Sequence, residues 1–145
     1  MIFNITLAAI LGMVIGYERE HRRKPAGLRT YTLVALGASL FTILSSASLV
    51  NDLDVSSFDP SRIASQVVVG IGFIGGGLIF LKNNRLEGLT TAAGLWVTAA
   101  IGMATGFGFR YIAIYATILV LIVLWAMRRI EDYIHKEKIT DNGVS

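Results

Sequence analysis

The stretch VVVGIGFIGGG, residues 67–77, raises the first question about the fold. Its glycines at positions 70, 72 and 75 have the G-x-G-x-x-G spacing of a dinucleotide-binding turn. Such a turn must open an amphipathic helix, but Lys82 follows the glycines too closely to leave room for one. We therefore interpret the glycines as a site of close helix packing in lipid, where absent side chains let two backbones approach.

Uncharged runs account for nearly the whole chain. Of its 145 residues, 54% are hydrophobic and 16% are charged, whereas soluble domains are about one quarter charged. A bilayer core about 30 Å thick takes roughly 20 helical residues, and the runs approach that length. The sequence predicts an all-α integral membrane protein with five transmembrane helices, in residues 1–17, 30–50, 63–81, 88–109 and 111–127. Residues 1–127 would form one transmembrane domain, and residues 128–145 a short cytoplasmic tail.

Glycine pairs recur in these runs at the G-x-x-x-G spacing. Each pair places two glycines on one helix face, where a second helix can approach closely. Membrane helices are rich in glycine, so a single pair by itself proves no interface. Together the pairs favour a compact, glycine-rich bundle. They are Gly12 and Gly16, Gly72 and Gly76, and Gly102 and Gly106.

The distribution of cations gives the expected orientation. Of the 13 lysines and arginines, all except Arg62 and Arg110 fall in the first connection, the third connection or the C-terminal tail. With five spans, these three segments share one side of the membrane. The positive-inside rule makes that side cytoplasmic. We therefore expect the N-terminus outside the cell and the C-terminus in the cytoplasm.

Polar residues gather where the three cytoplasmic connections would meet. Two interpretations stay open. In the first, charged pairs four residues apart, such as Glu18 and Arg22, lie on a solvated helix end. In the second, a partly desolvated cluster contacts a ligand or a partner, and Arg19 and Arg29 are hydrogen-bonded to the carboxylates. The candidate residues are Glu18, Arg19, Glu20, Arg29, Thr30, Glu87, Thr90 and Thr91. Of these, Thr30 is also a candidate cap for the second helix, and Thr90 and Thr91 could either cap the fourth or line a polar pocket.

Motifs of catalysis and of metal binding are missing from the sequence. It contains no Walker loop, no G-x-S-x-G, no H-E-x-x-H and no cysteine. The arginines beside Glu18 and Glu20 would compete with a metal ion for the carboxylates, so we expect no metal site and at most a weak Mg²⁺ interaction. Aromatic residues do not interleave with the cations, as stacking on nucleic acid would require. We expect neither an enzyme nor a nucleic-acid-binding protein, and no cofactor.

Four ordered motifs resemble those of the MgtC/SapB membrane protein family. They are GYERE at 16–20, AGLRT at 26–30, GIGFIGGGLI at 70–79 and GLTTAAGLWVTAAIGMATGFG at 88–108. The resemblance covers about residues 7–127. It places Glu18, Arg19 and Glu20 in the family's charged segment, residues 26–30 in its second signature and residues 88–93 in its third. Many members continue into a soluble domain, and this chain resembles a short member without one.

The resemblance implies a multi-pass protein of the bacterial inner membrane that is associated with magnesium limitation. Some members resemble regulators of the F-type ATP synthase more than transporters. We therefore expect a non-enzymatic protein for magnesium homeostasis and stress adaptation that modulates other membrane proteins. The alternative is an oligomeric channel or carrier for Mg²⁺ or another small solute. The expected partners are the lipid bilayer, other membrane proteins and further copies of the chain.

Overall fold

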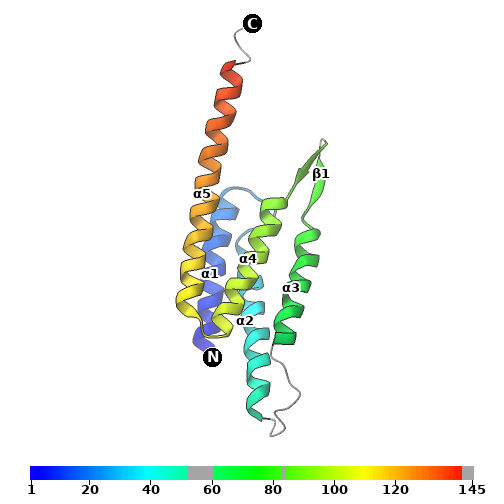
Figure 1. Ribbon diagram of the computed structural model, residues 1–145, viewed down its shortest axis with the longest axis vertical. Coiled ribbons are helices and arrows are strands. Elements are labelled where there is room, and N and C mark those ends of the chain that lie inside the picture. Colours follow the sequence, from blue (N-terminus) through cyan, green and yellow to red (C-terminus); the bar gives the residue numbers. More distant parts are fainter. Residues whose placement is uncertain (52–60, 83, 142–145) are drawn as a thin grey trace.

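The computed structural model describes residues 1–51, 61–82 and 84–141, and most of them are helical (Figure 1). In the view of Figure 1, α5 and α3 lie at opposite edges of the molecule, with the other helices between them. The elements in chain order are α1 (Ile2–His21), α2 (Leu28–Asn51), α3 (Ser61–Gly76), β1 (Phe80–Lys82), β2 (Arg85–Glu87), α4 (Leu89–Gly106) and α5 (Arg110–Asp141).

Four of the described helices contain segments long and apolar enough to cross a membrane. These segments are Ile2–His21, Leu28–Ser46, Leu89–Gly106 and Arg110–Arg129. The predicted helical fold is thereby confirmed, and four of the five predicted spans have the length and composition that crossing a membrane requires. The predicted helix over residues 63–81 is too long, because α3 ends at Gly76. At 1.5 Å per residue its 16 residues reach about 24 Å, less than the bilayer core of about 30 Å.

A short antiparallel hairpin that the sequence did not predict joins α3 to α4. Strands β1 and β2 pair with Phe80 opposite Glu87. Asn84 has a φ of 61°, a left-handed conformation that asparagine tolerates in turns. Gly88 closes the hairpin with a φ of 92°, and a Cβ there would collide with the carbonyl oxygen of Leu78. Only glycine satisfies both conditions, so this position is fixed by the turn.

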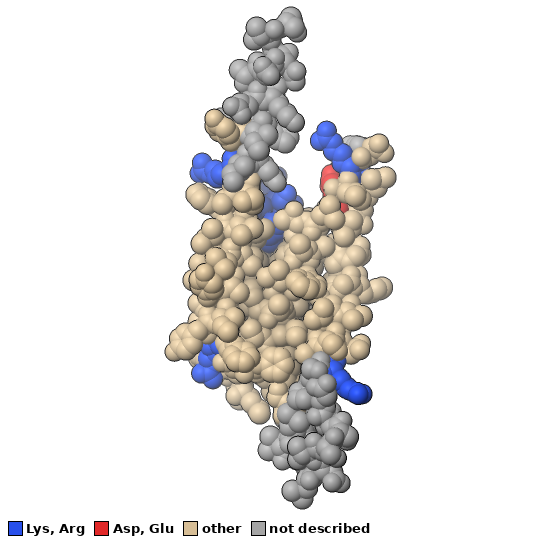
Figure 2. Space-filling model, viewed as in Figure 1, with Lys and Arg blue, Asp and Glu red and all other residues tan. Residues whose placement is uncertain are grey.

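Helix α4 contacts each of the other four helices. Helices α1 and α4 pack along α2, α3 packs mainly on α4, and α5 packs on α4 and α1. The buried core combines Ile15 of α1, Tyr31 of α2, and Leu95 and Ile101 of α4. Helices α3 and α5 are peripheral, and they leave many apolar side chains uncovered by protein. The middle of the face shown in Figure 2 accordingly carries no charged side chain, as expected of a surface in contact with lipid.

The six glycines of the G-x-x-x-G pairs have two different surroundings. A Cβ built on Gly12 would lie 2.6 Å from the Tyr31 carbonyl oxygen, and one on Gly16 would lie 2.8 Å from the Leu28 Cα. Gly102 and Gly106 of α4 likewise leave no space for a Cβ beside α2. A Cβ on Gly72 or Gly76 of α3 would meet no atom within 4 Å. For these two glycines, close helix packing stays a prediction.

Gly12→Ala should destabilise the bundle, because the added methyl group would have to displace the backbone of α2. Overpacking of this kind costs about 1–3 kcal/mol, and the melting temperature in detergent should fall accordingly. Gly72→Ala is the matched control, since it adds the same methyl group to open space and alanine favours a helix by up to about 1 kcal/mol. Equal melting temperatures for the two variants would contradict this account of the α1–α2 contact.

Candidate functional site at one end of the bundle

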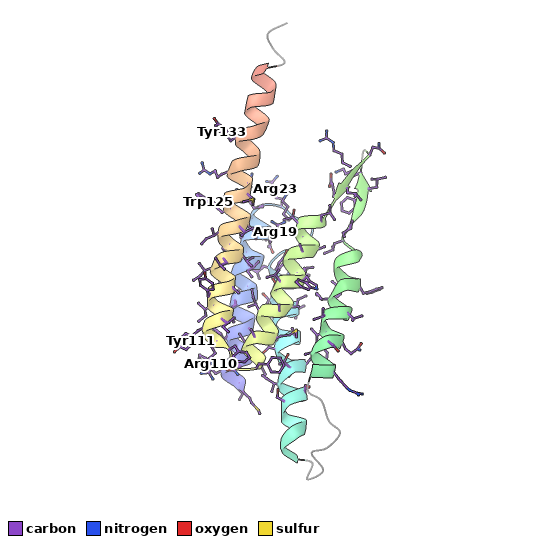
Figure 3. All side chains as sticks on the ribbon, in the orientation of Figure 1. Arg19, Arg23, Arg110, Tyr111, Trp125 and Tyr133 are labelled. Carbon is purple, nitrogen blue, oxygen red and sulfur yellow. The ribbon has the colours of Figure 1, made fainter. Side chains whose placement is uncertain are left out.

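Arg19, in the last turn of α1, is the one charged side chain that is buried among the described residues, with 4% of its surface exposed. Its Nη2 donates a hydrogen bond of 3.2 Å to Oγ1 of Thr91 on α4. Its Nη1 lies 3.8 Å from Oε2 of Glu18, within the distance of an ion pair. Figure 3 shows Arg19 and Arg23 near the hairpin end of the molecule, and Arg110 near the other end. A charged hydrogen bond thus joins α1 to α4.

Tyr31 brings α2 to the same point. Its side chain is 0% exposed, and its hydroxyl donates a hydrogen bond of 3.2 Å to the carbonyl oxygen of Thr91. Gly94, one turn further along α4, makes room for this hydroxyl, because a Cβ there would lie 2.6 Å from it. Helices α1, α2 and α4 therefore all meet at Thr91. We call Glu18, Arg19, Tyr31 and Thr91 the Arg19 junction.

The Arg19 junction contains polar atoms without a hydrogen-bond partner. Nε of Arg19 and Oε2 of Glu18 are both buried, and neither takes part in a hydrogen bond in the part of the chain that the structure describes. A buried donor or acceptor left unpaired costs about 1–3 kcal/mol, and more when the group is charged. The junction therefore has unused capacity for hydrogen bonding at the hairpin end of the bundle.

Two of the three glutamates predicted for the site have separate structural roles. Oε1 of Glu18 accepts a hydrogen bond of 3.3 Å from Nε of Arg22, so these two residues, four apart in the sequence, form the predicted pair. Oε2 of Glu20 accepts a hydrogen bond of 2.8 Å from the backbone N–H of Leu28, the first residue of α2. A carboxylate at this position satisfies a free amide and complements the positive end of the helix dipole. Glu20 therefore links the end of α1 to the start of α2.

Besides Glu20, four of the predicted site residues lie outside the Arg19 junction. Arg29, Glu87 and Thr90 are exposed, and Thr30 is half-buried. None of these four side chains forms an ion pair or a hydrogen bond within the described residues. The structure thus brings together Glu18, Arg19 and Thr91, and it leaves Arg29 without the predicted carboxylate partner.

The predicted threonine caps are wrong. Helix α2 begins at Leu28, two residues before Thr30, and its first amide is bonded to a glutamate instead. The N-cap of α4 is Gly88, and no side chain caps that helix. Thr91 is instead a buried partner of Arg19, whereas its neighbour Thr90 faces outward.

A second polar contact, at the opposite end of the bundle, was not predicted. Nε of Arg110, the first residue of α5, donates a hydrogen bond of 3.0 Å to Oδ1 of the buried Asn4 on α1. The Arg110 guanidinium also lies 5.0 Å from the centre of the Phe3 ring, within the range of a cation–π contact. The sequence did contain a signal for this contact. Asn4 lies inside an apolar run, and a buried side-chain amide needs a hydrogen-bond partner.

Carboxylates and histidines do not converge in the described residues. Across residues 1–51, 61–82 and 84–141, no group of three or more histidine, aspartate or glutamate side chains is placed to hold a metal ion. The Arg19 junction itself is centred on a cation, and a positive charge repels metal ions. Its chemistry is that of a donor of hydrogen bonds to anionic or carbonyl oxygens.

Thr91→Val should destabilise the protein by about 1.5–3 kcal/mol, because it removes a hydrogen-bond acceptor from the buried Arg19 guanidinium at nearly unchanged volume. Thr90→Val is the matched control at the neighbouring exposed position and should change the stability little. Unfolding in detergent, followed by circular dichroism, gives the comparison. If the two variants unfold alike, the Arg19–Thr91 hydrogen bond does not hold α1 to α4.

The sequence is similar to several bacterial proteins. Over 125 residues it is 50% identical to YhiD of Escherichia coli K12, which is named as a candidate magnesium transporter; the match covers 85% of this chain and 58% of that protein. Over 142 residues it is 42% identical to MgtC of Salmonella typhimurium, covering 98% of this chain and 58% of the relative. MgtC of Brucella abortus is 46% identical over 116 residues, covering 80% and 46%.

The chain therefore spans about half the length of these relatives. No solved structure matches it. The model of the MgtC family matches residues 5–133, which include the whole Arg19 junction and all but the first three residues of the four apolar segments long enough to cross a membrane. The chain belongs to the MgtC family.

Proposed function

We propose that the protein is a non-enzymatic component of the bacterial inner membrane that takes part in adaptation to magnesium limitation. In this proposal it acts by contacting other membrane proteins, such as the F-type ATP synthase, and changing their activity. Membership of the MgtC family and the magnesium-related names of the relatives support a role connected with magnesium. The mechanism is our inference from the buried charge and the exposed helix faces of the bundle.

The proposed orientation has the hairpin end of the bundle in the cytoplasm, with the N-terminus outside and the C-terminus inside. The α1–α2 connection and the hairpin carry Arg22, Arg23, Lys24, Lys82 and Arg85 at this end. The described cations of the opposite end are Arg62, at the start of α3, and Arg110, at the start of α5. This asymmetry supports the orientation through the positive-inside rule.

The observation that carries the proposal is the buried positive charge of Arg19. A guanidinium fixed between α1 and α4 raises the electrostatic barrier to any cation that would pass through the bundle there. The hydrogen bonds to Thr91 also hold three helices together at this point, which favours a rigid scaffold over a moving carrier. A rigid bundle that disfavours Mg²⁺ in its interior fits a protein that acts through its outer surface.

Helix α5 offers the broadest outer surface. Only 11% of its apolar segment, Arg110–Arg129, is buried within the chain, compared with 39–44% of each of the other three candidate spans. Large apolar side chains such as Ile118 and Ile122 are exposed on it. In a membrane this face contacts either lipid or the helices of another protein. We propose that it is the surface for partner proteins or for further copies of the chain.

An oligomeric channel or carrier for Mg²⁺ is the second candidate. It is favoured by the name of the YhiD relative of Escherichia coli K12. The threonines inside the bundle offer little support for a polar path within one copy, since Thr98 and Thr105 donate their hydroxyl groups to carbonyls of their own helix. A conducting path would therefore have to lie between copies.

Reconstitution in liposomes tests the two candidates together. With F-type ATP synthase in the same vesicles, the protein should lower the rate of ATP-driven proton pumping in proportion to its amount. A Mg²⁺ indicator inside vesicles that contain the protein alone should report no flux above that of empty vesicles. The double variant Ile118→Ala/Ile122→Ala on α5 should lose the effect on pumping. Val69→Ala/Phe73→Ala, exposed on α3, is the matched control and should keep it.

Either of two results would overturn the proposal. Robust Mg²⁺ flux with the protein alone would favour the channel or carrier. Unchanged proton pumping at every amount of added protein would exclude the ATP synthase as the partner.

A further inference from the structure

A lateral groove separates α2 from α3. Its volume is about 680 Å³, which lies within the range of about 300–1,000 Å³ typical of pockets for small molecules. Leu33 and Phe41 of α2 and Ile71 of α3 contribute to its apolar walls, and Ala99 of α4 also lines it. The groove exists because α3 packs on α4 and has few contacts with α2. Any occupant must therefore be largely apolar.

The length of the groove matches one half of a bilayer. Its lining on α2 runs from Arg29 to Phe41, a rise of about 18 Å along the helix. Half of a bilayer core is about 15 Å thick. Because α2 starts at the hairpin end of the bundle, the groove begins at the level of the membrane surface on that side and extends to about the middle of the membrane. These dimensions suit a hydrocarbon chain from one leaflet.

The surface end of the groove carries an unpaired cation. Arg29 is exposed, lines the groove, and forms no ion pair or hydrogen bond within the described residues. Arg19 and Arg110, by contrast, are hydrogen-bonded to Thr91 and Asn4. An apolar groove with a free guanidinium at its mouth is complementary to a molecule with an anionic head and an apolar tail.

We propose that this groove binds an anionic phospholipid of the cytoplasmic leaflet, with an acyl chain between α2 and α3 and the phosphate at Arg29. Basic pockets between helices on the cytoplasmic side are a general means of binding acidic headgroups. The proposal rests on the orientation proposed above, but it does not depend on whether the protein regulates or transports.

A second copy of the chain fits the groove less well. Two copies in one membrane share the same orientation, so a symmetric dimer has its twofold axis along the membrane normal. Packing across the groove would place the Arg29 side chains of both copies at the same depth and close to each other. Like charges repel, most strongly where water is scarce. A lipid phosphate would place a negative charge beside Arg29, whereas a second copy would place another positive charge there.

Native mass spectrometry of the detergent-solubilised protein tests the proposal. Titration with phosphatidylglycerol should show saturable binding that phosphatidylcholine does not match, and inorganic phosphate should not compete. Arg29→Ala should weaken the binding of phosphatidylglycerol by about fivefold, the effect expected of one cation beside an anionic lipid surface. Arg85→Ala, at the same end but outside the groove lining, is the matched control and should bind as the native protein does.

A second variant tests the groove independently of charge. Gly37 lines the groove, and a Cβ there meets no atom within 4 Å, so Gly37→Leu adds an apolar side chain to the groove wall. It should weaken binding of phosphatidylglycerol, whereas Ala100→Leu, exposed on α4 and outside the groove lining, should not.

Three results would overturn the proposal. The first is that the protein binds the two lipids equally, and the second is that Arg29→Ala and Gly37→Leu both bind phosphatidylglycerol as the native protein does. The third is that the protein forms a dimer that excludes lipid and that Gly37→Leu abolishes. None of these measurements involves magnesium flux or the ATP synthase. Failure here is therefore distinguishable from failure of the proposed function.

Discussion

The burial of one positive charge among apolar helices is the constraint on which the rest of the structure depends. A charge inside a membrane protein is tolerated only where other polar groups surround it. Arg19 meets this condition near the end of α1, where Thr91 of α4 and Glu18 lie within reach. Tyr31 adds α2 to the same point. The three helices are therefore held at fixed depths relative to one another, because sliding any of them would separate the guanidinium from its partners.

This constraint divides the bundle into a fixed centre and two peripheral helices. Helices α1, α2 and α4 approach closely, and the glycines facing α2 leave no space for a side chain. Helix α3 stands away from α2 and opens the groove, while α5 exposes most of its apolar surface. The centre gives the protein its rigidity. The periphery offers surfaces to the other components of the membrane, and we propose that the groove takes a lipid and α5 a neighbouring helix.

The sequence predicted the helical membrane fold and part of the site, because these depend on local patterns. Apolar runs of sufficient length mark four of the helices, and the spacing of Glu18 and Arg22 predicts their pairing. The hairpin was missed because the uncharged run continues through Phe80 without a change in composition. The role of Tyr31 was missed for a different reason. Which side chains meet between helices depends on the rotation and depth of each helix, and a single sequence does not encode these in any short pattern.

Cysteine labelling from each side of the membrane tests the arrangement most directly. The chain contains no cysteine, so Arg85→Cys and Phe109→Cys each introduce a single reactive thiol, at opposite ends of α4. A membrane-impermeant maleimide is added to right-side-out and to inverted vesicles. The account predicts that position 85 reacts only in inverted vesicles and position 109 only in right-side-out vesicles. Labelling of both positions from the same side would show that α4 does not cross the membrane, and it would contradict the account.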